Sequence, residues 1–348
     1  MSETAFRRAQ MGQEATRGTA VAADIVLVDG ILTGNPDYKF SVPEEDRNSL
    51  AQFHQRTLIQ QEVALKWEGP CNFEDVIHWL LMSMKDTTAT QPDVGGNPTV
   101  YLWDFIPRLN TANAPISYTV EWGDNTQELE AEFVMAKSVT FKFAMGEPVR
   151  VSVEMFGRNL AKSTFTASLV AGAKEEAIST KAQVWIDSTW ATLGTTLKSN
   201  FLRSAEITIP GPMPYRTASG GNPYYSTYVE PRRTASVKLA FVANADGWTE
   251  YDAMASLAGT LRAIRIKVNG SLISGAYYKY LEFDLLCRYD EPPEMFVDDE
   301  GKTTIVITAH TYDDHTDNDA AAGTSGGKFG NTEGNDFAIE VQNTVATS

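Results

Sequence analysis

Apolar residues alternate with polar ones in many short stretches of this chain, and a period of two is the pattern of half-buried β-strands. Val63, Leu65 and Trp67 are one example. The same reasoning predicts strands at 25–28, 40–42, 62–67, 99–105, 116–122, 138–143, 149–155, 263–268, 280–285 and 304–308. Gly146 to Pro148 forms a turn signal between two of them and predicts a hairpin. Helices do not alternate with the strands, so a parallel α/β fold is excluded and a mainly β fold is expected.

Helical periodicity is clear in one stretch, which predicts a helix over 72–84. Asn72 is a good N-cap and Asp75 follows three residues later, near the spacing of a capping box. The apolar residues of this stretch fall on one face of a helix: Phe73, Ile77, Leu80, Leu81 and Met84. His78, within it, is interpreted as a packed helix residue. A second, acidic-capped helix is predicted after Asp246.

The second half of the chain repeats the order of the first. Val237, Leu239 and Phe241 alternate as Val63, Leu65 and Trp67 do, at an offset of 174 residues, half of the 348. A strand, a proline, a strand, a capped helix and further strands then follow in both halves, which indicates a duplication. We expect two tandem β-sandwich or barrel domains, each with one flanking α-helix. The predicted divisions are an N-terminal arm (1–22), domains at 23–175 and 176–315, and a C-terminal segment (316–348).

The charge balance narrows the possible partners. Lys and Arg number 29 against 45 Asp and Glu, a net charge of −16. Such a surface argues against static binding of DNA or anionic lipid, although DNA could pass close by. The two cysteines, Cys71 and Cys287, make a disulfide framework or a Cys-based zinc site unlikely to form. No apolar run approaches 18 residues and the first 22 residues are polar, so we expect a soluble protein that is not exported by the usual route.

No sequence motif predicts catalysis. The segment 323–328 resembles a phosphate loop, but Ala322 and Phe329 occupy positions that need Gly and Ser or Thr. Four residues alternate like calcium ligands: Asp313, His315, Asp317 and Asp319. Asn318 stands where that loop needs glycine, and the bidentate glutamate is missing, so a solvated acidic loop is expected. We therefore predict no catalytic, cofactor-binding or metal-binding residues, no cofactor and no enzymatic activity.

Two neighbouring segments carry a resemblance to a known family. They are 184–196 (VWIDSTWATLGTT) and 201–209 (FLRSAEITI), and a polar loop (210–233), a strand (235–241), a helix (248–257) and a strand (261–268) follow. This series resembles the tail tube, or major tail, proteins of long-tailed bacteriophages. The similarity covers most of 180–310, and residues 23–160 resemble the same domain more distantly. An acidic insert at 290–301 departs from the pattern.

The resemblance implies a structural protein. Family members fold as a β-sandwich with a flanking helix, and one sheet of each domain joins its neighbours in a barrel around a channel. Stacked rings then form the tube through which DNA leaves the virion. The implied partners are other copies of the chain, the tape measure protein, the tail terminator and tail tip proteins, and double-stranded DNA in transit, with no membrane. The implied location is the virion tail, assembled in the host cytoplasm.

Further expectations concern assembly. Six domains per ring and two per chain predict a trimeric ring with pseudo-sixfold symmetry around an acidic channel. The predicted contact surfaces are the arm (1–22), loops 85–98 and 211–233, and the stretch 336–341, whose alternation suits adding a strand to a neighbour. The alternative is a glycan-binding β-sandwich of the cell surface or virion, using Tyr224, Tyr225 and Tyr228. A glycosidase with two facing carboxylates is a third hypothesis.

Overall fold

The computed structural model of the chain is mainly β, as the alternation predicts. It describes residues 7–44, 53, 55–108, 111–124, 126–216, 221–255, 261–289, 294–299, 301–312 and 336–347. The strands and helices of these residues are β1 (Arg8–Gln13), β2 (Ile25–Val26), β3 (Ile31–Ser41), β4 (Thr57–Pro70), α1 (Val76–Ser83), β5 (Tyr101–Phe105), β6 (Tyr118–Gly123), β7 (Glu128–Ala144), β8 (Arg150–Ser163), β9 (Ala182–Asp187), β10 (Leu202–Pro210), β11 (Met213–Tyr215), β12 (Thr227–Val229), β13 (Ser236–Val242), α2 (Ala245–Ala255), β14 (Leu261–Ser274), β15 (Tyr277–Tyr289), β16 (Glu294–Asp299), β17 (Lys302–Thr311) and β18 (Phe337–Asn343).

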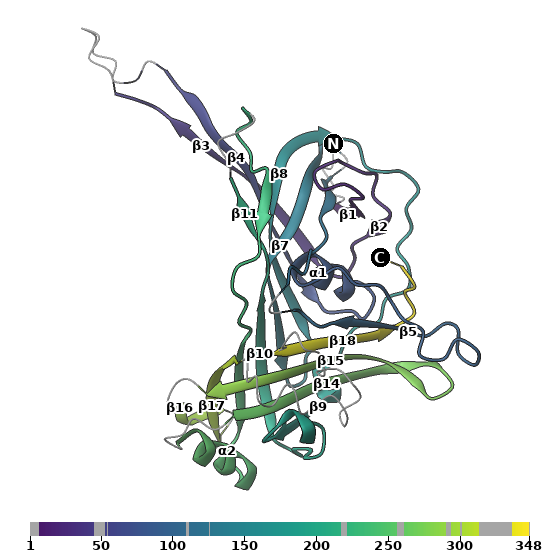
Figure 1. Ribbon diagram of the computed structural model, residues 1–348, viewed down its shortest axis with the longest axis vertical. Coiled ribbons are helices and arrows are strands. Elements are labelled where there is room, and N and C mark those ends of the chain that lie inside the picture. Colours follow the sequence, from purple (N-terminus) through teal and green to yellow (C-terminus); the bar gives the residue numbers. More distant parts are fainter. Residues whose placement is uncertain are drawn as a thin grey trace.

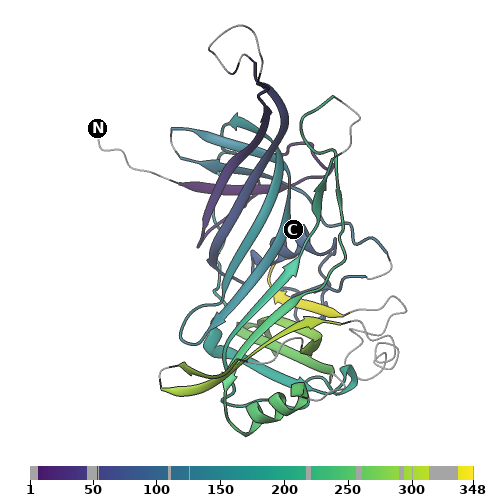
Figure 2. The same cartoon turned by 90° about the vertical axis from the view of Figure 1, so that its left-hand side faces the viewer.

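Eight antiparallel strands form one layer, which we call the long sheet. Their order is β3-β4-β8-β7-β10-β13-β17-β16. The hairpin predicted at Gly146 joins β7 to β8, and Gly146 has a φ of 90°, which glycine adopts without strain. The long sheet runs along the molecule in Figure 2, where its strands lie side by side.

A second layer covers one face of the long sheet. It contains the strands β9-β14-β15-β18-β5, which we call the cover sheet. The two layers meet through aromatic side chains, because the ring of Phe283 on β15 lies 4.9 Å from Phe141 and 5.9 Å from Phe143 on β7. Figure 1 shows both layers with α1 on the covered side of the long sheet.

Helix α1 lies inside the protein. Its predicted cap forms: the Asp75 N–H donates to Asn72 Oδ1 at 2.6 Å, and Asn72 Nδ2 donates to Asp75 Oδ2 at 2.9 Å. The predicted apolar face is buried, but every residue of α1 is buried as well, including His78 and Ser83. Helix α1 is thus internal rather than flanking, because the layers enclose it on all sides. Helix α2 lies at one end of the molecule (Figure 1).

The two halves of the chain share a sheet and a core. Strand β7 comes before the predicted boundary at 175 and β10 after it, and the two pair over Ser138–Ala144 and Ser204–Pro210. One apolar cluster includes Val63 and Trp67 from the first half and Val237 and Phe241 from the second. The tandem division remains a prediction.

Strand order is the same in both halves. In the first, the chain order β3, β4, β7, β8 becomes the sheet order β3-β4-β8-β7. In the second, β10, β13, β16, β17 becomes β10-β13-β17-β16. Helix α1 follows β4, and α2 follows β13. Because neighbouring strands are antiparallel throughout, β10 runs in the same direction as β3. The acidic insert at 290–301 is thus the place of β16, the counterpart of β7.

Candidate assembly surfaces

The uncovered face of the long sheet is polar. Its centre is a shallow hollow of about 340 Å³ over β4, β8, β7 and β10. The charged side chains of this hollow are three cations and three anions: Lys66, Lys142, Arg150, Glu68, Glu154 and Glu206. Small hydroxyl side chains such as Thr140 and Ser152 lie between them. We call this surface the polar face.

Charges on the polar face are paired across and along strands. Lys66 Nζ lies 2.6 Å from Glu68 Oε1, and its hydrogen bond lowers the pKa of Glu68 below the usual value. Lys142 Nζ on β7 lies 3.3 Å from Glu206 Oε2 on β10. All four side chains are about half exposed, so each pair is weak. The hollow is balanced in charge, whereas the sequence predicted an acidic lining.

The β3–β4 hairpin projects beyond the body of the protein (Figure 1). Several of its apolar side chains are exposed, among them Tyr38, Leu58 and Ile59. The Arg56 guanidinium lies over the ring of Phe40, 3.4 Å from its centroid. Exposed apolar groups on a projecting ribbon are typical of a surface that contacts another protein.

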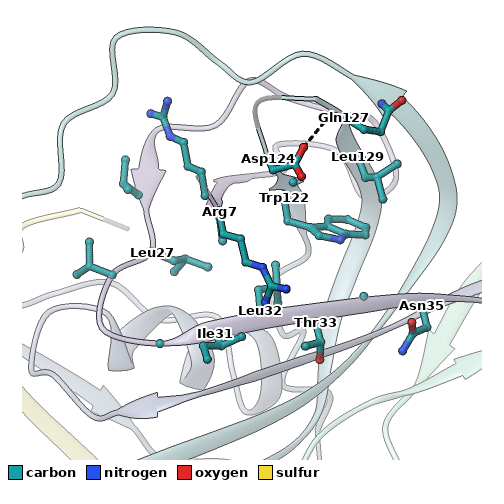
Figure 3. A pocket seen from close by; sticks show the side chains of 17 residues that line it. Arg7, Leu27, Ile31, Leu32, Thr33, Asn35, Trp122, Asp124, Gln127 and Leu129 are labelled. Carbon is teal, nitrogen blue, oxygen red and sulfur yellow. Dashed lines mark hydrogen bonds between the residues drawn. The ribbon is translucent and has the colours of Figure 1, made fainter. Parts of the chain in front are cut away.

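A pocket of about 690 Å³ lies at the base of this hairpin, between β1, β2, the first part of β3 and the β6–β7 turn. Figure 3 shows Leu27, Ile31 and Trp122 around it, with Arg7 near the opening. Its carboxylate, Asp124, accepts the backbone N–H of Gln127 at 2.9 Å and so holds the turn. The pocket offers apolar surface beside the edge of β3 and no second carboxylate for acid–base chemistry.

The N-terminal arm is part of the chain's own fold. Strand β1 pairs with β6 and β2, and Met11 is fully buried. Glu14 is buried and accepts four hydrogen bonds, from Ser117 Oγ, Thr119 Oγ1 and the backbone N–H groups of Gly18 and Phe133. The expectation that residues 1–22 lack the apolar surface to order alone is wrong for β1, because strand pairing and a buried carboxylate hold the arm.

The C-terminal strand also stays within its own chain. Strand β18 lies between β15 and β5, and all seven of its residues are buried. The expectation that 336–341 adds to a neighbour's sheet is therefore wrong. Its alternation was read correctly as a strand, but both edges of that strand are occupied by the chain itself.

The two predicted contact loops differ. In loop 85–98, Thr90 exchanges two backbone hydrogen bonds of 2.8 Å with Leu102 and so covers the edge of β5. In loop 211–233, Tyr225 is fully buried, and its hydroxyl donates to the Phe133 carbonyl at 2.5 Å. Tyr224 and Tyr228 are partly buried under the guanidinium groups of Arg158 and Arg17. The three tyrosines predicted for glycan binding thus do not form an exposed aromatic surface.

Chemistry-bearing residues do not gather into a site. Among the residues that the structure describes, no three His, Cys, Asp or Glu side chains could hold a metal ion together. His78 is buried, with Nδ1 3.2 Å from the Tyr118 hydroxyl, and burial lowers its pKa to about 3. The predicted acidic loop Asp313 to Asp319 and the segment 323–328 lie outside the described residues.

No protein-family model matches the chain, and no curated protein matches it either. In the part of the chain that the structure covers, no helix is long and apolar enough to cross a membrane. The fold class is therefore shown by the structure itself, and the surfaces described above carry the functional argument.

Proposed function

We propose that this chain is the structural subunit of a bacteriophage tail tube, with no enzymatic role, and that three copies close each ring. The observation that carries the proposal is the repeated strand order of the long sheet. A sheet made of two equivalent four-stranded halves, with the same strand direction in each, supports rotation of one unit about an axis outside the chain. The resemblance at 180–310 points to the same class of protein.

The width of the sheet supports three copies. Three chains supply 24 strands, and at about 4.8 Å between strands and a tilt of about 40° they close a barrel roughly 48 Å across between backbones. Side chains of about 5 Å on each side leave an opening near 38 Å. That opening admits a DNA duplex about 20 Å wide, whereas two chains would leave an opening of roughly 20 Å.

The polar face suits the lining of such a channel. Its paired lysines and glutamates leave little net field, and its small hydroxyl groups offer no aromatic platform for bases. DNA would find few cations to hold it and could slide. Charge balance replaces the acidic lining that the sequence predicted.

The proposed partners follow from this arrangement. Other copies of the chain make the ring and stack it, while the tape measure, tail terminator and tail tip proteins contact the tube and its ends. DNA passes through without a lasting complex. The tube is assembled in the host cytoplasm and remains in the virion tail.

Electron microscopy of the purified, assembled protein tests the proposal. We expect tubes whose end views average to threefold symmetry with six similar lobes, and a mass of three chains per layer. Globular particles at every concentration and salt would contradict a tube protein. Six full chains per layer would contradict the trimer.

A further inference from the structure

The long sheet ends in two strands that each have one partner among the described strands. At one end, β3 pairs with β4, and at the other, β16 pairs with β17. Unpaired backbone donors and acceptors on such edges are templates for another strand. The alternating directions make β16 and β3 antiparallel when two copies are placed side by side, so the edges are compatible.

The β7–β10 junction shows how two such units join. Strand β7 ends the first four-stranded unit and β10 begins the second, just as β16 ends one chain and β3 begins the next. In this junction Ser138 lies opposite Pro210, and Lys142 lies opposite Glu206. The two halves can therefore be compared through their registers.

The registers give one set of equivalent residues. Val63 and Val237 occupy the same place, with Pro36 opposite Val63 and Ile207 opposite Val237. Lys39 on β3, three residues on, therefore corresponds to Pro210. Across the other strands, Glu154 on β8 corresponds to Val306 on β17 by its pairing.

The same comparison places the partner of Lys39. Ser138 lies opposite Glu154, and Glu294 lies opposite Val306, so Glu294 takes the place of Ser138. Ser138 and Pro210 face each other in the internal junction. Their counterparts in a junction between chains are Glu294 and Lys39, which carry opposite charges.

We propose that β16 of one copy pairs antiparallel with β3 of the next, with Glu294 opposite Lys39. The inference deepens the proposed function, on which it rests for the closure of a ring. Both side chains are exposed in the single chain. Both lie on the side of the polar face, because Lys39 pairs with Gln60, two and four positions from the inward Val63 pattern's alternate, outward residues Ala64 and Lys66.

Charge complementarity supports this register over a shifted one. Opposite charges directly across an antiparallel pair stabilise it, and like charges destabilise it. The internal junction has such a pair in Lys142 and Glu206, 3.3 Å apart. Pro36 gives β3 no backbone donor at its position, so side-chain contacts carry more of the selectivity of this edge.

Charge reversal tests the junction. Lys39→Glu and Glu294→Lys each place like charges opposite one another, and we expect each to raise the protein concentration needed for assembly about tenfold. The double variant Lys39→Glu with Glu294→Lys should return that concentration to within about twofold of the unchanged chain. Matched reversals at exposed Lys181 and Glu176 should leave it unchanged. Thermal unfolding of the unassembled proteins checks that each variant folds.

A cysteine pair separates this proposal from the function. Chains carrying Lys39→Cys and Glu294→Cys should cross-link between copies on mild oxidation, because directly opposite strand residues are within disulfide reach. The native Cys71 and Cys287 are both buried. Tubes that assemble equally well in both single charge variants and show no cross-link would overturn the register while leaving the tube function standing. Cross-linked chains that never form rings or tubes would support the junction and overturn the tube.

Discussion

Buried polar side chains in this protein are held by specific partners, and their burial sets their protonation. Lys279 Nζ lies 2.6 Å from Glu74 Oε1 and joins β15 to the turn before α1. His78 has a different environment, because the Tyr118 hydroxyl is its hydrogen-bond partner and burial, with a smaller effect of Lys174, lowers its pKa to about 3. A neutral imidazole in the core follows from these contacts.

Protonation of His78 should make the protein less stable in acid. In the unfolded chain a histidine has a pKa near 6.5, so between about pH 6.5 and 3 only the unfolded state takes up this proton. The free energy of unfolding should fall as the pH falls through this window, by up to about 1.4 kcal/mol per pH unit, and the contribution is fully present above pH 6.5. Urea unfolding of the unchanged chain and of His78→Gln at pH 7, 6, 5 and 4 measures the difference. Parallel pH profiles for the two proteins would show that His78 does not titrate this way.

At the scale of elements, the two ends of the chain complete its layers. Strand β1 extends the β6–β7 side, and β18 fills the gap between β5 and β15. Neither end resembles a free arm once its strand pairs. Each is a short strand whose few apolar residues become sufficient only because other strands supply both the hydrogen bonds and the buried surface.

Truncating Met11 should therefore destabilise a single, unassembled chain. Met11 is fully buried, and Met11→Ala removes its side chain from the core, which costs about 2–5 kcal/mol. Thr16→Ala is a matched control in the same arm, because Thr16 is exposed. Denaturant unfolding at a concentration below that of assembly measures both. A cost below about 0.5 kcal/mol for Met11→Ala would mean that the arm is dispensable to the fold.

The whole molecule is organised by the repeat of its strand order and by the contrast between its two faces. One face of the long sheet carries the cover sheet and α1, while the other presents paired charges to solvent. In the proposed ring this second face meets DNA. Its neutrality, rather than the net charge of the chain, then decides whether DNA is held or released.

Removing the anions of the polar face should convert it into a DNA-binding surface. The variant Glu68→Gln, Glu154→Gln and Glu206→Gln leaves Lys66, Lys142 and Arg150 without balancing charge. We expect assembled tubes of this variant to retain duplex DNA at 50 mM salt and to release it at 200 mM, because phosphate contacts weaken steeply with salt. Tubes of the unchanged chain should retain none. Co-sedimentation of labelled DNA measures this, and equal retention by both kinds of tube would contradict the polar face as the lining.

The sequence alone determined the mainly β class, the buried sides of the strands and the cap of α1. These are local properties: a period of two places alternate side chains on one face, and Asn72 lies within reach of Asp75. The tertiary structure decided which strands are edges, because a strand's hydrogen-bond partners come from distant parts of the chain. It placed β18 in the interior, turned the acidic insert into the edge strand β16 and covered Tyr225. Alternation describes the two faces of a strand, and only the assembled sheet determines what lies along its two edges.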